Sequence, residues 1–251
     1  MISIKSEKEI ELMRHAGYLV SLTHQYLKDF VKPGITTKEL DKLAYDFIKK
    51  HDGVPSCLGY EGFPATLCTS VNDEVVHGIP SNYKLKDGDI ITIDMVIGYK
   101  GYQGDAAWTY AVGNISDDKK YLMEHTEKAL YEGIKMVKPG NRIGDISNAV
   151  EKYSHEHNLG VVEELCGHGI GLDMHEAPDV PNFGKPGVGP RLKEGMVICI
   201  EPMLNYGLKD IYILDDGWTI KTLDGLPSAH YEHTVLVTKD GYEILTPRLD
   251  D

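Results

Sequence analysis

The sequence predicts a mixed α/β fold built from two related halves, and three observations lead to that prediction. Segments with apolar residues at helical spacing are interleaved with short segments of period-two alternation. A Lys-Pro-Gly turn before a helix begins at Lys32 and again, 106 positions later, at Lys138. The segment from Lys84 to Asp94 aligns with the segment from Arg191 to Glu201, 107 positions on. Two nearly equal offsets indicate an internal repeat, with halves of roughly 1–113 and 114–251 inside a single domain of residues 1–251.

Four segments are predicted helices because their apolar residues fall on one helical face. They are Ser6 to Phe30, Thr36 to Gly53, Ser116 to Lys138 and Gly144 to His157. Thr36-x-x-Glu39 has the form of a capping box, in which two side chains satisfy the first free amides of a helix. Short strands are expected from Ser56 to Tyr60, Ala65 to Ser70 and Val75 to His77.

The segment from Asp89 to Tyr110 is predicted to be a β-hairpin at the centre of the fold. Apolar side chains alternate along its first half, and Gly98 to Gly101 has turn composition. If the hairpin closes symmetrically on Tyr99-Lys100, Asp94 lies directly opposite Asp105. Like charges in that position destabilise a hairpin, so a shared proton, a basic neighbour or a bound cation must offset the repulsion. A bulge that turns one Asp to solvent is the alternative.

The composition excludes several classes of protein. With 251 residues, 41% hydrophobic and 26% charged, the chain can bury one ample core. Its formal net charge of −13 argues against unspecific binding to DNA or to anionic membranes. A run of about 18 apolar residues is absent, so no membrane span is expected, and the N-terminus has no signal-peptide core. Four widely spaced cysteines, without a Cys-x-x-Cys pair, favour the reducing cytoplasm.

Three further segments place polar side chains where a plain core would not. His168 lies among glycines, Glu201 follows an apolar strand, and Glu232 begins another strand. Together with Asp94 and Asp105 they supply four carboxylates and one imidazole, more than one divalent ion needs. This set suits two ions about 3.5–4 Å apart, and its oxygen-rich character favours Mn, Fe, Co or Zn. Any one acid alone is most simply a solvated residue, whereas five such residues in a duplicated frame favour a metal centre.

Several motifs make the chain similar to a known family over nearly its whole length. They are KPGITTKELD from Lys32, SVNDEVVHGIP from Ser70, IDMVIGYKGYQGDAAWT from Ile93, GHGIGLDMHEAPDVPNF from Gly167, EGMVICIEPM from Glu194 and YEHTVLVT from Tyr231. The sequence resembles the type I methionine aminopeptidases, in the bacterial form without an N-terminal zinc-binding extension. That resemblance implies the pita-bread α/β fold, two pseudo-symmetric halves around a dinuclear metal site.

The resemblance also implies roles for individual residues. The positions that match the five metal ligands are Asp94, Asp105, His168, Glu201 and Glu232. His77 and His175 match two histidines near the substrate, and Glu201 matches a proton shuttle. The positions that match a methionine pocket are Cys57, Tyr60, Phe63, Cys68 and Trp218. Asn72 and Ser228 match a monovalent-cation site in some members. Four positions depart from the commonest family pattern, and these are Glu61, Phe63, Met174 and His230.

The implied function is a metal-dependent hydrolase that removes the N-terminal methionine from nascent proteins and peptides. A small second residue is expected, with attack by a water held between two ions. Nascent N-termini are the expected partners, with transient ribosome contact, and the chain is expected to be a monomer.

Two alternatives share the fold, namely an Xaa-Pro aminopeptidase or prolidase-like peptidase and a catalytically inactive peptide-binding protein. The first class usually carries a large additional N-terminal domain, and the second has usually lost metal ligands. An oxygenase facial triad, with two histidines and one carboxylate, has the reverse ligand ratio.

Overall fold

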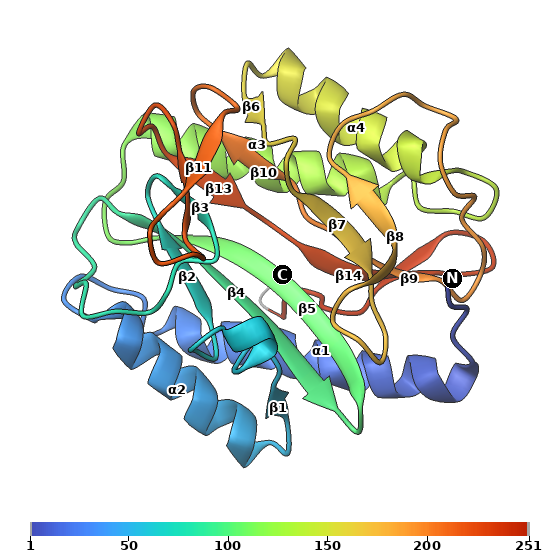
Figure 1. Ribbon diagram of the computed structural model, residues 1–251, viewed down its shortest axis with the longest axis horizontal. Helices are drawn as coiled ribbons and strands as arrows, with labels where there is room; N and C mark the ends of the chain where they lie inside the picture. The colour runs from blue at the N-terminus through green and yellow to red at the C-terminus, as the bar shows by residue number, and fades with distance from the viewer. Residues whose placement is uncertain (1, 250–251) are drawn as a thin grey trace.

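The computed structural model describes residues 2–249, and within that range the chain is a mixed α/β protein (Figure 1). The helices are α1 (Glu7–Lys28), α2 (Thr37–Lys50), α3 (Asp117–Ile134) and α4 (Ile143–Glu156), with a 3₁₀ turn η1 at Tyr60–Gly62. The strands of the first half are β1 (Val54–Pro55), β2 (Cys68–Val71), β3 (Glu74–Val76), β4 (Ile90–Tyr99) and β5 (Tyr102–Ala111). The later strands are β6 (Gly160–Val161), β7 (Cys166–Gly169), β8 (Glu176–Pro181), β9 (Val197–Ile200), β10 (Met203–Asn205), β11 (Ile211–Ile213), β12 (Ile220–Thr222), β13 (Ser228–His230), β14 (His233–Val237) and β15 (Tyr242–Ile244).

The predicted helices are confirmed, and their ends follow capping chemistry. Thr36 Oγ1 accepts a hydrogen bond from the Glu39 amide at 3.1 Å, and Glu39 Oε2 accepts one from the Thr36 amide at 2.8 Å. This is the capping box expected from the sequence. Ser116 caps α3 with its side-chain oxygen, which accepts a hydrogen bond from the Lys119 amide.

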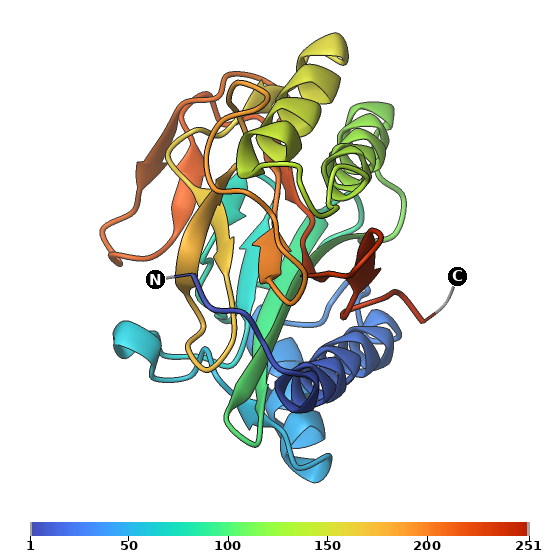
Figure 2. The same ribbon diagram turned by 90° about the vertical axis from the view of Figure 1, so that its right-hand side faces the viewer.

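The described strands form four sheets, of which the two larger ones frame the molecule with the helices on their outside (Figure 2), and the smaller ones have the orders β13-β10-β6 and β11-β12-β3. One sheet has the strand order β1-β4-β2, with β5 paired to β4, and the other has the order β15-β14-β9-β7-β8. α1 and α2 lie on one side of the central hairpin, and α3 and α4 lie on the other (Figure 1). Apolar side chains of each helix pair fill a core against the neighbouring strands. The inner face of the strands is therefore left to line a site.

The repeated Lys-Pro-Gly turns have the same backbone hydrogen bond in both halves. The Gly34 amide donates to Leu85 O at 2.8 Å, and the Gly140 amide donates to Leu192 O at 3.2 Å. Both glycines have left-handed φ values, +98° and +96°, a conformation that glycine adopts without a Cβ penalty. The isolated β-bridges recur at the same offsets, Thr36 with Lys84 and Arg142 with Arg191.

The central hairpin has a different register from the predicted one. Tyr99 pairs with Tyr102, so Lys100 and Gly101 form the two-residue loop, with φ values of +48° and +92°. Two positive φ values are typical of a type I′ turn, whose twist matches that of the flanking strands. The prediction that Asp94 directly faces Asp105 is therefore wrong.

The prediction of a strand from Ser56 to Tyr60 is also wrong. Beyond β1 that segment turns into η1, where Gly59, Glu61 and Gly62 all have positive φ. Inside the predicted range, the amides of Leu58 and Tyr60 already donate back three residues, to Pro55 O and Cys57 O, and such turns do not continue an extended strand. Among the helices of residues 2–249, none combines the length and apolarity that crossing a bilayer requires.

Candidate active site

One cavity of about 550 Å³ gathers the side chains that the sequence singled out. The predicted site residues that line it are Cys57, Tyr60, Phe63, Cys68, His77, Asp94, Asp105, His168, His175, Glu201, Trp218 and Glu232. Its described lining residues include histidines but no lysine or arginine, so no permanently charged side chain offsets the carboxylates there.

Asp94 and Asp105 still share one face of the hairpin although they do not face each other directly. Asp94 lies opposite Ala107, and Asp105 lies opposite Val96. The two aspartates are thus diagonal neighbours, a relation that places Cβ atoms about 7–8 Å apart on one face. The turn shifts the register by two residues, and an even shift leaves each side chain on its original face. Both carboxylates reach the cavity for this reason.

Glu232 lies beside Asp105 because its strand segment is tied to β5. The Glu232 amide donates to Ala107 O at 2.8 Å. Two residues on, Thr234 Oγ1 accepts from the Asp105 amide at 3.0 Å and donates to Asp105 O at 2.8 Å. These bonds hold the backbones of the two acids next to each other.

His168 projects into the cavity from β7, where its neighbours are glycines for a steric reason. A Cβ at Gly167 would lie 2.3 Å from Cys199 O, and one at Gly169 would lie 2.3 Å from Ala177 O. Any side chain at these two positions would clash with the backbones of β8 and β9, which lie close to β7. His168 Nδ1 donates to Gly169 O at 2.9 Å, so Nε2 carries the free lone pair in the neutral imidazole.

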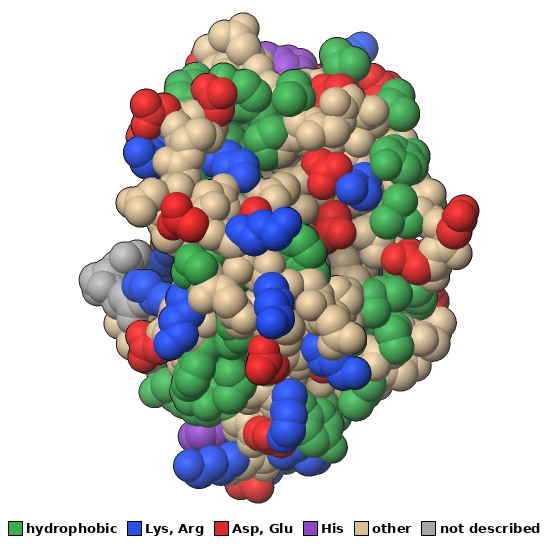
Figure 3. Space-filling model, turned by 90° about the vertical axis from the view of Figure 1, so that its left-hand side faces the viewer, with side chains coloured by type: hydrophobic (Ala, Val, Ile, Leu, Met, Phe, Trp, Pro, Cys, Tyr) green, Lys and Arg blue, Asp and Glu red, His purple; other side chains and the backbone are tan. Residues whose placement is uncertain are grey.

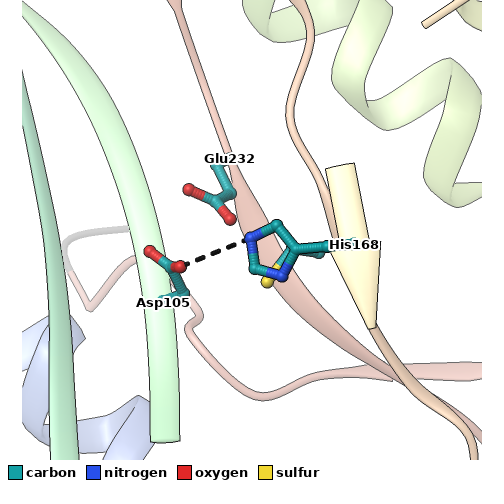
Figure 4. A group of neighbouring side chains, drawn as sticks. Asp105, His168 and Glu232 are labelled. Atoms are coloured by element: carbon teal, nitrogen blue, oxygen red, sulfur yellow. Dashed lines mark ion pairs between the residues drawn. The ribbon is translucent and has the colours of Figure 1, made fainter. Parts of the chain in front are cut away.

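Glu201 completes the set from the end of β9. The following Pro202 has no amide to donate and ends the strand, and Asn182 Nδ2 donates to Glu201 O at 3.1 Å. Glu201 Oε1 lies 3.5 Å from His168 Nε2, and Asp105 Oδ2 lies 3.7 Å from the same nitrogen. Figure 4 shows Asp105, His168 and Glu232 pointing toward one another.

Without bound cations, the protein environment disfavours the charged forms of the four carboxylates. Burial raises the pKa of Asp94 to about 7. Burial, followed by repulsion from Glu232 and Asp94, raises the pKa of Asp105 well above its ordinary value. Burial and neighbouring carboxylates raise the pKa values of Glu201 and Glu232 in the same direction. Four acids in one buried space therefore need protons or cations.

The donor set fits divalent cations. Asp105 Oδ1 and Glu232 Oε1 are buried and have no hydrogen-bond partner in the described chain. Donor separations of 3.5–3.7 Å around His168 exceed a hydrogen bond and approach the spacing of two donors bound about 2.0–2.1 Å from one ion. Burial lowers the pKa of His168 to about 4, so its imidazole is neutral near pH 7 and can bind a metal.

The sequence analysis missed Cys199 as a neighbour of this group. Ligand atoms of Asp105, His168, Cys199 and Glu232 all lie within 4.8 Å of one another. Cys199 alternates with Ile198 and Ile200 along an apolar strand, and such a pattern gives no signal beyond core packing. Its Sγ lies 3.7 Å from Thr234 Oγ1, and burial raises the pKa of its thiol well above the ordinary value. The neutral thiol is a weak ligand beside four carboxylates.

An apolar pocket adjoins the carboxylates. Its buried members are Cys57, Phe63, Ala65, Cys68, Val96 and Met174, with Tyr60, Ile79 and Trp218 packed against them. Phe63 and Trp218 meet edge to face, with ring centroids 5.1 Å apart. The sequence analysis did not include Val96, which lines the cavity, nor Ala65 and Ile79, which pack in the same cluster without being lining residues. Small or aliphatic residues carry no chemical signature that separates a pocket wall from a core.

His77 and His175 lie at the border between the apolar pocket and the carboxylates. His77 has a φ of +58°, a strained value for a residue with a side chain, and such strain concentrates at functional sites. His175 Nδ1 lies 2.8 Å from the Tyr60 hydroxyl, and its ring meets that of His168 edge to face at 4.4 Å. Burial lowers the pKa of His77 to about 4 and also lowers the pKa of His175.

Asn72 and Ser228 lie side by side outside this cavity. The Ser228 amide donates to Asn72 O at 2.9 Å. The Asn72 side-chain oxygen accepts from Lys119 Nζ at 2.7 Å, and the same ammonium donates to Gly88 O at 2.7 Å. A lysine ammonium thus already contacts this amide oxygen, and a monovalent cation near Asn72 and Ser228 stays a prediction.

Comparison with known proteins decides the family. Residues 11–239 match the model of metallopeptidase family M24. The chain belongs to metallopeptidase family M24. It is 52% identical to methionine aminopeptidase 1 of Bacillus subtilis (strain 168), over 98% of this chain and 99% of that protein. A crystal structure of methionine aminopeptidase from Rickettsia prowazekii superposes with a TM-score of 0.97 at 44% identity, covering 98% of this chain and 100% of the other. The predicted resemblance is thereby confirmed.

A structure with lower sequence identity shares the same fold. Prolidase from Pyrococcus horikoshii OT3 superposes with a TM-score of 0.79 at 23% identity, covering 97% of this chain and 63% of that chain. This likeness shows the common fold alone. The mixed α/β pita-bread fold expected from the sequence is confirmed by both neighbours.

Proposed function

We propose that this protein removes the N-terminal methionine from nascent proteins and peptides, as a metal-dependent aminopeptidase. The observation that carries the proposal is one cavity in which five metal-ligand candidates adjoin an apolar slot. Close relatives named methionine aminopeptidases support it. The whole chain, 1–251, acts as one catalytic domain with an internal repeat of roughly 1–113 and 114–251.

The metal-binding residues that we propose are Asp94, Asp105, His168, Glu201 and Glu232. Four carboxylates and one neutral imidazole are enough for two divalent ions, which we expect to be Mn, Fe, Co or Zn. When bound, the ions supply a water of lowered pKa near neutral pH. Asp105 and Glu232 would be shared by the two ions, and His168 and Glu201 would contribute to the same one.

Three side chains are proposed to handle protons and the scissile amide. Glu201 would accept the proton of the attacking water, because its carboxylate lines the cavity beside the other ligand candidates, with Oε1 3.5 Å from His168 Nε2. His175 donates to the developing oxyanion, and the Tyr60 hydroxyl bound to its Nδ1 orients the ring. His77 holds the scissile amide from its fixed, strained position.

The apolar pocket is proposed to take the methionine side chain. Cys57 and Cys68 are buried beside aromatic rings, and soft, polarizable walls suit a thioether. An unbranched chain enters a closed slot, whereas leucine branches early and meets the wall. One misfitted methylene changes binding by about 1–3 kcal/mol, so discrimination is large but not absolute.

The proposed setting follows from the substrate. Nascent N-termini emerge in the cytoplasm, where we place the protein as a monomer that contacts the ribosome transiently.

A panel of peptides tests the proposal. The value of kcat/KM is measured for Met-Ala-Ser, norleucine-Ala-Ser, Leu-Ala-Ser and Met-Lys-Ser under one metal condition. We expect Met-Ala-Ser and the norleucine peptide to be cleaved well, and the other two poorly. Equal rates for the Leu and Met peptides would refute the slot. A preference for Xaa-Pro peptides over the whole panel would support the proline-directed alternative.

A further inference from the structure

His230 is a buried imidazole in the same cavity for which neither the family resemblance nor the proposed mechanism supplies a role. It ends β13 and is 2% exposed. Its backbone is fixed, because its amide donates to Thr109 Oγ1 at 3.1 Å and its carbonyl accepts from that hydroxyl at 2.9 Å. Neither ring nitrogen has a hydrogen-bond partner among the described residues. A buried polar group without a partner costs about 1–3 kcal/mol, so such a group calls for an explanation.

The only acidic group recorded within ion-pair distance of this ring, in residues 2–249, is Glu201. His230 Nε2 lies 3.7 Å from Glu201 Oε2. The other oxygen, Oε1, lies 3.5 Å from His168 Nε2. The Glu201 carboxylate is therefore held between two imidazoles, with one oxygen facing the ligand group and the other facing His230.

The two imidazoles differ in which nitrogen can carry the proton. His168 Nδ1 donates to Gly169 O at 2.9 Å, which leaves Nε2 free as a metal ligand. His230 Nδ1 has no acceptor within reach, so a proton on that atom would be a buried donor without a partner. A proton on Nε2 faces a carboxylate oxygen instead. The tautomer that binds metals through Nε2 is thus favoured at His168 and disfavoured at His230.

We propose that His230 is a positioning residue, whose Nε2–H donates to Glu201 Oε2 and so aims Oε1 at the metal. This proposal rests on the function proposed above. The 3.7 Å separation needs to shorten by about 0.5 Å to reach an ordinary hydrogen bond, a movement within side-chain rotation. Carboxylates that bind metals are commonly hydrogen-bonded on their outer side, and loss of such a partner lowers metal affinity or activity about 10–100-fold.

Two substitutions at His230 separate hydrogen bonding from packing. His230→Gln keeps a donor amide, whereas His230→Leu keeps volume and loses the donor. We expect His230→Leu to raise the Kd for Mn about 10–100-fold, by competition with a chromophoric chelator, and to lower kcat more than it raises KM. His230→Gln should recover most of both losses. The exposed His15, substituted by Leu and by Gln in parallel, should leave the Kd unchanged.

The opposite outcomes overturn the proposal. An unchanged Kd in His230→Leu would mean that Glu201 needs no support from this ring. A loss in His230→Gln as large as that in His230→Leu would mean that the imidazole itself binds the metal.

The tautomer can be read on the unmodified zinc-loaded protein, independently of whether any variant folds. Long-range ¹H–¹⁵N spectra should show His230 protonated at Nε2 and His168 at Nδ1. Protonation of His230 at Nδ1 would contradict the proposal. The Kd for Mn and the tautomer need no peptide substrate, so failure of the proposed aminopeptidase activity would leave both readouts intact and would be recognised separately.

Discussion

At the scale of single residues, His175 carries the most specific claim about the chemistry. Its Nδ1 is engaged by the Tyr60 hydroxyl at 2.8 Å, and its ring adjoins that of His168. A hydroxyl proton on Nδ1 leaves Nε2 as the donor, so the ring is prepared to stabilise negative charge in the cavity. Burial raises the pKa of the Tyr60 hydroxyl, which favours the protonated form that donates to His175 Nδ1.

His175→Ala should therefore lower kcat about 10²–10³-fold with a smaller effect on KM, as expected for a contact that strengthens in the transition state. Steady-state kinetics with Met-Ala-Ser provide the measurement. Tyr60→Phe should give a milder loss in the same parameter, because the ring stays and only its orientation relaxes. A change confined to KM would show that His175 serves substrate binding alone.

At the scale of elements, the glycines beside His168 decide how β7 can present its side chain. Gly169→Ala adds a Cβ 2.3 Å from Ala177 O, so β7 and β8 must separate. We expect unfolding free energy to fall by about 1–3 kcal/mol and Mn affinity to weaken, because His168 moves with its strand. Gly241→Ala is the matched control, since no heavy atom lies within 4 Å of its Cβ position.

Urea unfolding and a metal titration of both variants test this point. If Gly169→Ala matches Gly241→Ala in stability and in Mn affinity, the close approach of the strands does not position His168.

Patterns among residues that are neighbours in sequence predicted most helices and strands. The elements that were predicted wrongly depend on backbone conformations that residue types do not reveal. The capping box at Thr36 and the alternation along β4 depend on neighbours in sequence, and both elements form where expected. The hairpin register depends on which two residues can adopt positive φ, and a lysine in that conformation is not evident from its type. Within the segment predicted as a strand, the amides of Leu58 and Tyr60 donate back to Pro55 O and Cys57 O, and left-handed Gly59 completes the bend. The candidate ligands come together as expected, but their roles remain predictions.

At the scale of the whole molecule, charge is dispersed on the surface and concentrated inside. The formal net charge is −13, yet acidic, basic and apolar side chains are interspersed over the face in Figure 3. Inside, the carboxylates of Asp94, Asp105, Glu201 and Glu232 share one cavity whose described lining includes histidines but no lysine or arginine. Cations bound there stabilise the fold by mass action, so chelation should lower the melting temperature as well as activity.

Buried histidines should make the molecule sensitive to acid. His24 is fully buried between α1 and β5, its Nε2 donates to Ala106 O at 3.1 Å, and burial lowers its pKa from 6.5 to about 3. Between those pH values the unfolded chain binds a proton that the folded chain does not. Stability is therefore lost as pH falls from 6.5 toward 3, at up to about 1.4 kcal/mol per pH unit for this one group.

His24→Gln should flatten that dependence, because glutamine does not titrate. Unfolding free energies of the metal-loaded protein at pH 7, 6 and 5 give the slope, and comparison with wild type cancels the contribution of other groups. Parallel slopes for the two proteins would show that His24 does not lose its proton on folding.

The most direct test of the account is release of methionine from Met-Ala-Ser by protein stripped of metal and then reloaded. Stripped protein should release none, and stepwise addition of Mn, Co or Fe should restore release, because the proposed site depends on cations to hold its carboxylates ionised. Undiminished release by the stripped protein, or no release by the reloaded protein, would contradict the account.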